Sequence, residues 1–413
     1  MRPNHVSSPV SRRSLLKAAA AVAAARPSTA FDKPQGNILA YISSYTPNGQ
    51  GIYQFHVDTA TGALTPGNVF SSIVNPSWIA FHPNKKTLYA VNEISNFNGT
   101  TTGAVTSLSV DQTNGNLKFL NQVSSGGAGP AHLSVDPSGK FVLVANYGGG
   151  NVAVIALNAD GSLGATTDVK ADTSACSPAC PVGATHASNA PPGSFAVSGH
   201  DAPHAHMIQT DPAGKFVIVN DLGLDKTIVW NFDKTTGKLS NPKTVSSSSG
   251  AGPRHFAFHP NGRWFYSLNE EASTLAFMSY DAATGTLSPV QEVSTLPAAF
   301  VGTNFTSEVM ISSDGNFIYA ANRLHDSIAV FVVRGTGEPR LIGESWTRGD
   351  YPRSFNIDPT GKFLYVCNQR GDSVTTFRTA QDDNEEDNGE ILKFTGRYTA
   401  VGSPASVAFL TLS

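Results

Sequence analysis

Hydrophobic and polar positions along this chain repeat as pairs of short strands. The repeat is clearest in residues 252–270, where a polar pair precedes alternating apolar residues, a His-Pro-Asn-Gly turn and a second apolar run. Alternation on both sides of such a turn predicts a β-hairpin over residues 256–268. Because the turn sends the chain back, both ends of the hairpin lie at one rim. We therefore expect Arg254, His255 and Glu270 to meet there.

The hairpin pattern occurs six times. Its turns stand at residues 82–84, 136–139, 211–214, 259–262, 312–315 and 358–361. Each turn is followed by an apolar run that ends in Asn or Asp. A second signature, a strand followed by Asp and a Gly-x-Leu turn, occurs seven times and is clearest at 52–64, 228–239 and 275–287. A unit repeated at the spacing of these turns is typical of the blades of a β-propeller.

The missing seventh hairpin can be assembled from the two ends of the chain. Residues 403–409 resemble a first strand and residues 38–43 a second strand. The sequence therefore predicts an all-β, seven-bladed propeller with four-stranded blades, closed by pairing the N- and C-terminal strands in one blade. The composition agrees, since 38 Gly, 25 Pro and only 14% charged residues suit many short strands.

Residues 1–30 have the order of a targeting segment. The pair Arg12-Arg13 resembles a bacterial twin-arginine export signal, an Ala-rich run follows at 18–25, and small residues at 28–30 offer a cleavage site. An amphipathic start helix or a disordered leader is the alternative. We expect the propeller to occupy residues 31–413 of a periplasmic or secreted protein.

Charge and hydropathy exclude two classes of partner. The formal net charge is −3 without a basic cluster, so we expect no nucleic-acid partner. No apolar run after the N-terminal segment is long enough to span a bilayer. We expect a monomer that acts on a small molecule.

Two segments depart from the repeat. Residues 164–203 are predicted to form a long insertion, either functional or disordered. In it, Cys176 and Cys180 are compatible with a disulfide or with two free thiols, whereas Cys367 is predicted to be a core residue. The acidic residues 381–390 indicate a solvated loop, or a calcium loop with poor ligand spacing.

Aligning the repeats brings charged and histidine residues to equivalent hairpin ends. The candidates before the turns are His132, His206, Arg254, His255, Glu308 and Arg353, with His204 close by. Those after the turns are Glu93, Glu270 and Arg323. In a propeller these positions lie on one face near the channel, where gathered charges normally mark binding or catalysis.

Each residue alone also has a structural interpretation. Arg254 can pair with Glu270, and Arg323 with Glu308, as plain ion pairs. The joint presence of His206, Arg254, Glu270 and Arg323 favours function.

The motifs PHAHMIQTDPAGKF, GPRHFAFHPNGRWFYSLNE and SEVMISSDGNFIYAANR carry a family resemblance. Together they resemble the seven-bladed propeller lactonases, which include the propeller type of 6-phosphogluconolactonase and the fungal 3-carboxy-cis,cis-muconate lactonizing enzyme. The resemblance covers nearly all of residues 37–412. It implies an active site in the channel with His206, Arg254 and Glu270 as catalytic residues and Arg323 as a further arginine. It implies neither metal nor cofactor.

Opening a lactone requires a water nucleophile, a base and positive charge for the oxyanion. Glu270 or His206 can serve as the base, and Arg254 and Arg323 can hold a substrate carboxylate or phosphate and stabilise the oxyanion. The same residues suit the reverse reaction, lactonization. We expect His132, His204, His255, Glu308, Arg353 and Glu93 to line the substrate site.

Three other interpretations compete with this one. A metal site is suggested by His186, His200, Asp201, His204 and His206, because a His-x-His pair on a strand points to one face. A serine hydrolase is disfavoured, because no Gly-x-Ser-x-Gly elbow appears in the sequence. A non-catalytic binding propeller is suggested by LYAVN, VLVAN and IYAAN, which resemble the YVTN repeats of surface-layer proteins, although such a scaffold does not need the charged ring.

Overall fold

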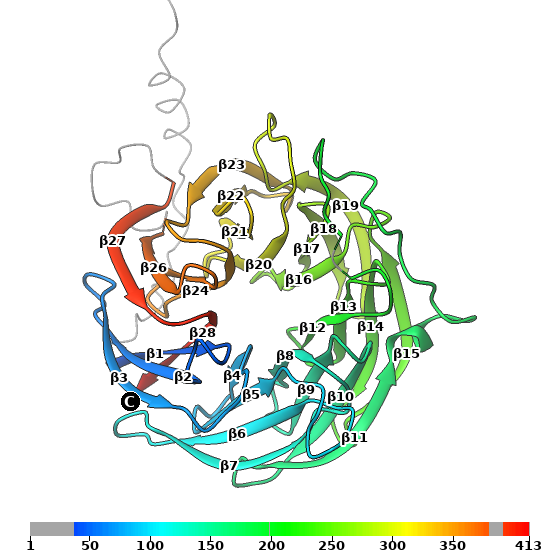
Figure 1. Cartoon of the computed structure of the whole chain (residues 1–413). Helices are drawn as coiled ribbons and strands as arrows, with labels where there is room; N and C mark the ends of the chain where they lie inside the picture. Colours follow the sequence, from blue (N-terminus) through cyan, green and yellow to red (C-terminus); the bar gives the residue numbers. More distant parts are fainter. Residues whose placement is uncertain (1–36, 198, 380–390, 413) are drawn as a thin grey trace, which may run out of the picture. The chain divides into compact units, whose positions relative to one another are not determined.

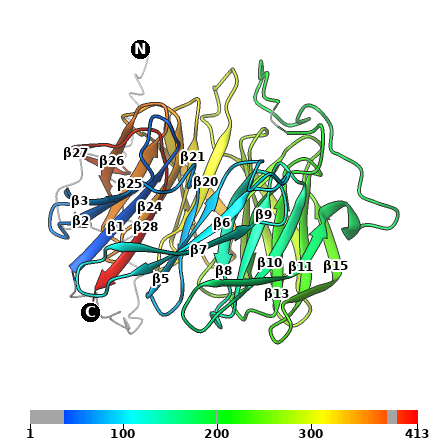
Figure 2. The ribbon, with the colours of Figure 1, turned by 60° about the horizontal axis from the view of Figure 1, so that its bottom comes forward.

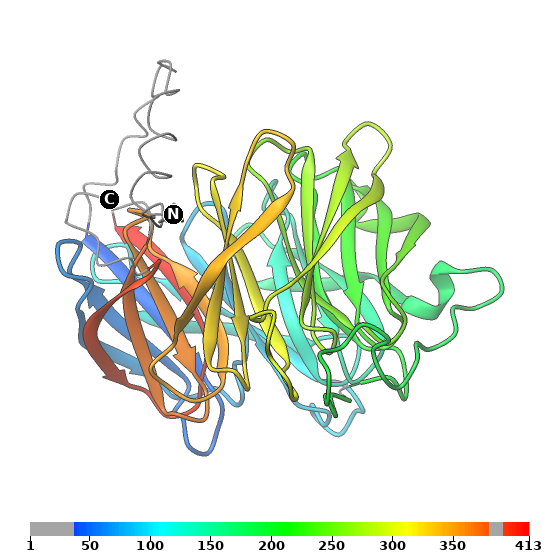
Figure 3. The same cartoon turned by 90° about the horizontal axis from the view of Figure 1, so that it is seen from above.

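The computed structural model describes residues 37–412 apart from 198 and 380–390. The predicted export signal and the acidic residues 381–390 therefore lie outside the described residues. The described residues form seven antiparallel sheets of four strands each. Figure 1 shows them arranged as a ring, as the sequence pattern predicts. Turned by 90°, the ring is seen edge-on with its connecting loops on two opposite faces (Figure 3).

From the channel outward, every sheet uses four strands in the same order. The innermost strands are β28 (Pro404–Leu412), β4 (Ile79–Phe81), β8 (Pro130–Val135), β12 (Ala205–Thr210), β16 (Pro253–Phe258), β20 (Thr306–Ile311) and β24 (Pro352–Ile357). The second strands are β1 (Asn37–Ser44), β5 (Thr87–Asn92), β9 (Phe141–Asn146), β13 (Phe216–Asp221), β17 (Trp264–Asn269), β21 (Phe317–Asn322) and β25 (Phe363–Asn368). The third strands are β2 (Ile52–Val57), β6 (Ala104–Val110), β10 (Asn151–Leu157), β14 (Lys226–Asp233), β18 (Thr274–Asp281), β22 (Ser327–Val333) and β26 (Ser373–Arg378). The outermost strands are β3 (Leu64–Phe70), β7 (Leu117–Ser124), β11 (Leu163–Ala171), β15 (Lys238–Ser246), β19 (Thr286–Ser294), β23 (Pro339–Trp346) and β27 (Lys393–Ala400).

The first residue of each hairpin turn explains why the turn forms. In the Asp-Pro turns the carboxylate accepts backbone N–H groups across the turn, as from Asp136 to the amide of Phe141 at 2.7 Å. In the His-Pro turns the imidazole ring accepts a backbone N–H of its own turn and also forms a hydrogen bond with the next sheet. His259 Nδ1 accepts the Asn261 N–H, and its Nε2 bonds the carbonyl oxygen of Gly315 at 3.0 Å. Local turn chemistry thus also fixes neighbouring sheets to each other.

Tyrosines of the second strands bond the turns between the third and fourth strands of the next sheet. The hydroxyl groups donate from Tyr41 to Gly115 O, from Tyr89 to Gly161 O, from Tyr266 to Gly337 O and from Tyr365 to Gly62 O, at 2.6–3.1 Å. Apolar clusters fill the space between adjoining sheets along the same strands. The two sequence signatures are therefore the two halves of one inter-sheet contact.

The ring closes where the sequence predicts. Strand β1 pairs with β28 from Asn37↔Leu412 to Ser44↔Pro404, with an irregularity at Ser43/Ser44. Figure 2 shows the blue and red strands side by side. The pairing buries Ile38, Ala40 and Val407 in one apolar cluster. The two ends of the propeller sequence are thus part of one sheet.

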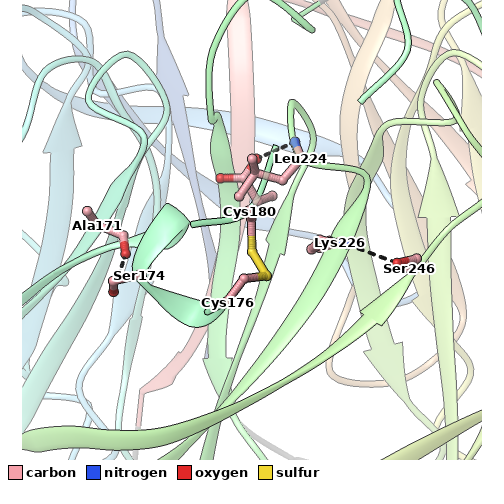
Figure 4. The surroundings of a disulfide bond; sticks show 8 residues. Ala171, Ser174, Cys176, Cys180, Leu224, Lys226 and Ser246 are labelled. Atoms are coloured by element: carbon pink, nitrogen blue, oxygen red, sulfur yellow. Dashed lines mark hydrogen bonds between the residues drawn. A yellow bond between two sulfur atoms is a disulfide. The ribbon is translucent and has the colours of Figure 1, made fainter. Parts of the chain in front are cut away.

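The segment before β12 is shorter than the predicted insertion. Residues 164–171 belong to β11, which pairs with β10 as the outermost strand of its sheet. The irregular part begins with the short 3₁₀ helix η2 (Asp172–Ala175). Cys176 and Cys180 form a disulfide just after η2 (Figure 4), and Cys367 is a buried free thiol.

The inner strands all begin at one end of the channel, and their first residues carry the candidate site. The other half of the channel contains a cavity of about 670 Å³ that is lined by Phe81, Val135, Phe258 and Ile311 and reaches His132 and Glu308. In the part of the chain that the structure describes, no helix is long and apolar enough to cross a membrane.

Candidate active site

Arg254, Glu270 and Arg323 form one buried ion cluster. Arg254 lies at the start of β16, Glu270 directly after β17 and Arg323 directly after β21. Glu270 Oε2 forms ion pairs with Arg254 Nε at 2.9 Å and with Arg323 Nη2 at 2.6 Å. The hairpin geometry thus brings Arg254 and Glu270 together, as expected. The structural alternative, a pair between Arg323 and Glu308, is not what the structure shows, because Arg323 pairs with Glu270 of the preceding sheet.

Both guanidinium groups are held by further contacts. Arg254 Nη1 donates to the backbone oxygen of Ser307 on β20. Arg323 Nη1 donates to the Tyr351 hydroxyl at 3.2 Å, and its guanidinium lies between the rings of Phe305 and Tyr351. Burial, followed by the charge of Arg323, lowers the pKa of Arg254 to about 10, which leaves it charged at neutral pH. The cluster is therefore a rigid source of positive potential.

Three histidine rings and one indole pack beside this cluster. The ring centroids of His206 and His255 are 5.1 Å apart, those of His255 and His132 are 5.5 Å apart, and Trp78 lies 4.5 Å from His132. Within the described residues, His206 Nδ1 is buried and has no hydrogen-bond partner. Burial and then the charge of Arg254 hold the pKa of His206 well below its usual range. His206 is therefore a neutral imidazole next to fixed positive charge.

Glu308 belongs to the histidine stack rather than to the arginine cluster. Its carboxylate contacts His255 Nδ1 at 3.0 Å and accepts from the Ser354 hydroxyl at 3.1 Å. Burial raises the pKa of Glu308 to about 7, and it also lowers the pKa of His132 and of His255. The expected grouping of His132, His255 and Glu308 near the channel is present, with these side chains in contact mainly with one another.

Arg353 and Glu93 form a second, weaker pair across the ring. Arg353 Nη2 lies 3.5 Å from Glu93 Oε2, and the Tyr45 hydroxyl donates to the same oxygen at 2.5 Å. The guanidinium also lies over the Tyr45 ring. Burial opposes the charge on Arg353, but Tyr45 and Glu93 outweigh it and raise its pKa. This pair adds a third arginine to the same end of the channel.

The histidines before β12 do not form the metal site that their spacing suggests. His200 contacts two carboxylates, and His204 contacts Asp201 and the carbonyl oxygen of Tyr147. The strand pairing is irregular between Ala205 and Met207, and the rings of His204 and His206 both contact Tyr147. His186 is exposed. Across residues 37–412, where described, no group of three or more His, Cys, Asp or Glu residues could hold a metal ion.

Aromatic residues of the site were missed by the sequence analysis. The Tyr147 ring stacks on His204 with centroids 4.3 Å apart and meets the edge of His206 at 5.5 Å. Burial and the charge of Glu270 raise the pKa of Tyr147, so its hydroxyl is a proton-bearing group. Tyr147 follows its second strand as Glu270 and Arg323 follow theirs, and this shared position is the signal that could have identified it.

The site thus combines a neutral base, fixed positive charge and aromatic walls. A neutral imidazole can take a proton from water, and guanidinium groups can stabilise an oxyanion in a site largely closed to solvent. These are the requirements for hydrolysis of an ester or lactone.

Comparison with known proteins agrees with this chemistry. The family model described as "Lactonase, 7-bladed beta-propeller" matches residues 39–409. A 6-phosphogluconolactonase of Bacillus subtilis is 33% identical over 90% of this chain and 96% of its own length. A 6-phosphogluconolactonase of Formosa agariphila is 29% identical over 89% and 99%. The structure of a periplasmic gluconolactonase of Pseudomonas aeruginosa superposes with a TM-score of 0.78 at 27% identity, over 91% of this chain and 99% of that one.

Proposed function

Because the chain belongs to the seven-bladed β-propeller lactonase family, we propose that its channel site hydrolyses the lactone of an anionic sugar acid. The observation that carries this proposal is the placement of neutral His206 beside two guanidinium groups that share Glu270 Oε2. One group is ready to accept a proton, and the other two supply positive charge for an oxyanion.

The proposed reaction begins with water attacking the lactone carbonyl carbon while His206 takes the proton. Arg254 and Arg323 stabilise the negative charge that develops on the carbonyl oxygen. The ring C–O bond then breaks, and the imidazolium returns the proton to the departing alkoxide. The products are one carboxylic acid and one hydroxyl group, so the step consumes one water molecule. Glu270 pairs with both guanidinium groups, and its proposed role is to orient them toward the carbonyl oxygen.

The balance of charge supports an anionic substrate. Arg254, Arg323 and Arg353 face the side chains of Glu93 and Glu270. Burial raises the pKa of Glu308 to about 7, so Glu308 is only partly ionised at neutral pH. The excess of positive charge is largely buried, where an opposite charge on the ligand is favourable. A phosphorylated or carboxylated sugar lactone fits this requirement, and so does a muconolactone.

We also propose export through the twin-arginine route into an oxidising compartment. Support comes from Arg12-Arg13 ahead of the Ala-rich run and from the disulfide between Cys176 and Cys180. The Pseudomonas aeruginosa gluconolactonase is itself described as periplasmic. Replacing both arginines by lysine should leave unprocessed protein in the cytoplasm; processed protein outside it would exclude this route.

The test of the function is a panel of lactones incubated with the purified protein, with acid release followed at constant pH. The panel contains glucono-δ-lactone, its 6-phosphate and a carboxylated muconolactone. We expect turnover above the spontaneous rate, faster for an anionic lactone than for the neutral one. No turnover of any lactone would favour the non-catalytic binding propeller.

A further inference from the structure

The last residues of the irregular segment before β12 lie directly against the candidate site. Gly199 is so close to the site that a β-carbon there would lie 2.3 Å from the Tyr147 hydroxyl and 2.7 Å from the His204 ring. Only glycine allows the backbone to pass at this distance. We call residues 199–204 the wall: its Gly199 lies against the Tyr147 hydroxyl, and its His204 stacks on the Tyr147 ring, which also meets His206.

His200 anchors this wall between two buried carboxylates. His200 Nδ1 lies 3.1 Å from Glu271 Oε1, and His200 Nε2 lies 3.1 Å from Asp225 Oδ1. The imidazole is almost completely buried, as are both partners. Because both partners are carboxylates, both ring nitrogens donate, and the imidazole is the charged form.

The two carboxylates lead to the backbone of Glu270 from opposite sides. Glu271 follows Glu270 directly in the chain. Asp225 accepts the N–H groups of Gly250 and Gly252, and the carbonyl oxygen of Gly252 accepts the Glu270 N–H at 2.7 Å. His200 thus joins the wall to the turn after β13 and to the turn that carries Glu270.

We propose that His200 is a positioning residue, which clamps residues 199–204 onto the site and fixes the Glu270 turn that aims Arg254 and Arg323. The effect on catalysis rests on the proposed lactonase function. The clamp itself does not, because it is a contact between parts of this chain.

The titration of His200 gives the clamp a defined dependence on pH. Burial would lower the pKa of His200, but hydrogen bonds to Asp225 and Glu271 outweigh it and raise the pKa to about 9. A group whose folded pKa lies above the usual 6.5 contributes stability that is complete below about 6.5 and is lost as the pH rises through about 9. The clamp should therefore open in alkaline solution.

Other ionisable groups face the same segment, and their contributions to its pH dependence must be distinguished from that of His200. Asp201 is adjacent and exposed. Asp172 of η2 faces Asp221 of β13, and burial followed by the other carboxyl raises the pKa of Asp172. That pair also loses stability with rising pH, above the usual 3.8 of a carboxyl group. A comparison of wild type with a His200 variant removes these shared contributions.

The test uses His200→Gln, with His186→Gln as the control, since His186 is an exposed histidine of the same segment. Hydrogen exchange in residues 172–204 and in the Glu270 turn is measured between pH 7 and 10, after correction for the intrinsic exchange rate. Wild type and His186→Gln should lose protection as the pH passes about 9. His200→Gln should lack that protection already at pH 7 and should show no such transition.

The kinetic arm measures kcat and KM of the same variants on the best lactone of the panel. Misplacement of the Glu270 turn should lower kcat/KM of His200→Gln by about 10–10²-fold, and added imidazole should restore part of it in His200→Gly. Wild-type protection in His200→Gln, or lost protection with unchanged kcat/KM, would overturn the proposal. If the wild type opened no lactone, the lactonase proposal would fail, whereas the exchange measurement would still decide the clamp. Should the variant not fold, a wild type without the transition near pH 9 overturns the clamp.

Discussion

At the scale of single residues, one carboxylate oxygen decides how the site is arranged. Glu270 Oε2 receives both Arg254 and Arg323, and the second of these comes from the next sheet. Because this carboxylate is engaged in two ion pairs with guanidinium groups, His206 remains as the group that can accept and return a proton. The sequence suggested either residue as the base, and the contacts favour His206.

Replacing Arg254 by lysine should damage catalysis more than it damages folding. A lysine ammonium is a point charge that cannot bond Glu270 and the Ser307 carbonyl in the same fixed geometry. Loss of one aimed oxyanion group costs about 10²–10³-fold in kcat, so a decrease of that size is expected in steady-state assays. Arg340→Lys on the exposed outer strand β23 is the control. Wild-type kcat in Arg254→Lys would remove this guanidinium from the mechanism.

Replacing Glu308 by glutamine should change how stability depends on pH. Burial raises the pKa of Glu308 from 4.5 to about 7, so its contribution to stability is complete below 4.5 and is lost as the pH rises through about 7. Melting temperatures of Glu308→Gln should therefore decrease less between pH 5 and pH 8 than those of wild type. The exposed Glu338→Gln should follow wild type, and an equally steep decrease in Glu308→Gln would contradict the assignment.

The sequence could predict side-chain contacts within one hairpin but not those between sheets. Arg254 and Glu270 belong to one hairpin, whose turn places its two ends together, so their pairing could be predicted. Arg323 reaches Glu270 because adjoining sheets are rotated about the channel axis, and no sequence spacing encodes that rotation. Tyr147 was overlooked because a tyrosine at the rim carries no charge to mark it.

At the scale of elements, the sequence repeat made the strands predictable. The structure of the irregular segment could not be predicted, because that segment has no repeat. Each blade contains the same turn residues, so alternation and turn chemistry give its four strands. Residues 172–204 have no such period. The position of the described residues among them depends on a disulfide and on ion pairs with distant turns, as His200 shows with Asp225 and Glu271.

Strand β28 should be essential for the fold, because it is the inner strand of the closing sheet. Removing residues 404–413 would expose the edge of β1 and open the ring. We expect the truncated protein to lose cooperative thermal unfolding in calorimetry, while removal of Ser413 alone should have little effect. A truncated protein that melts cooperatively at the wild-type temperature would contradict closure by β28.

At the scale of the whole propeller, the ring gathers hairpin ends from all sides onto one end of a channel. Arg254, Arg323 and Arg353 come from three different sheets, and His206 comes from a fourth. Each hairpin supplies one or two side chains at an equivalent position, so the site is assembled by closure of the ring. An alignment of repeats could name these side chains, whereas their contacts required the folded ring.

The central claim is that His206 moves the proton during lactone opening, and its direct test is the kcat/KM of His206→Asn. Acid release from the best lactone is measured at constant pH, with the exposed His186→Asn as the matched control. General acid–base catalysis contributes about 10²–10⁴-fold, so His206→Asn should lose a factor in that range while His186→Asn keeps wild-type turnover. Wild-type kcat/KM in a folded His206→Asn protein would contradict the account.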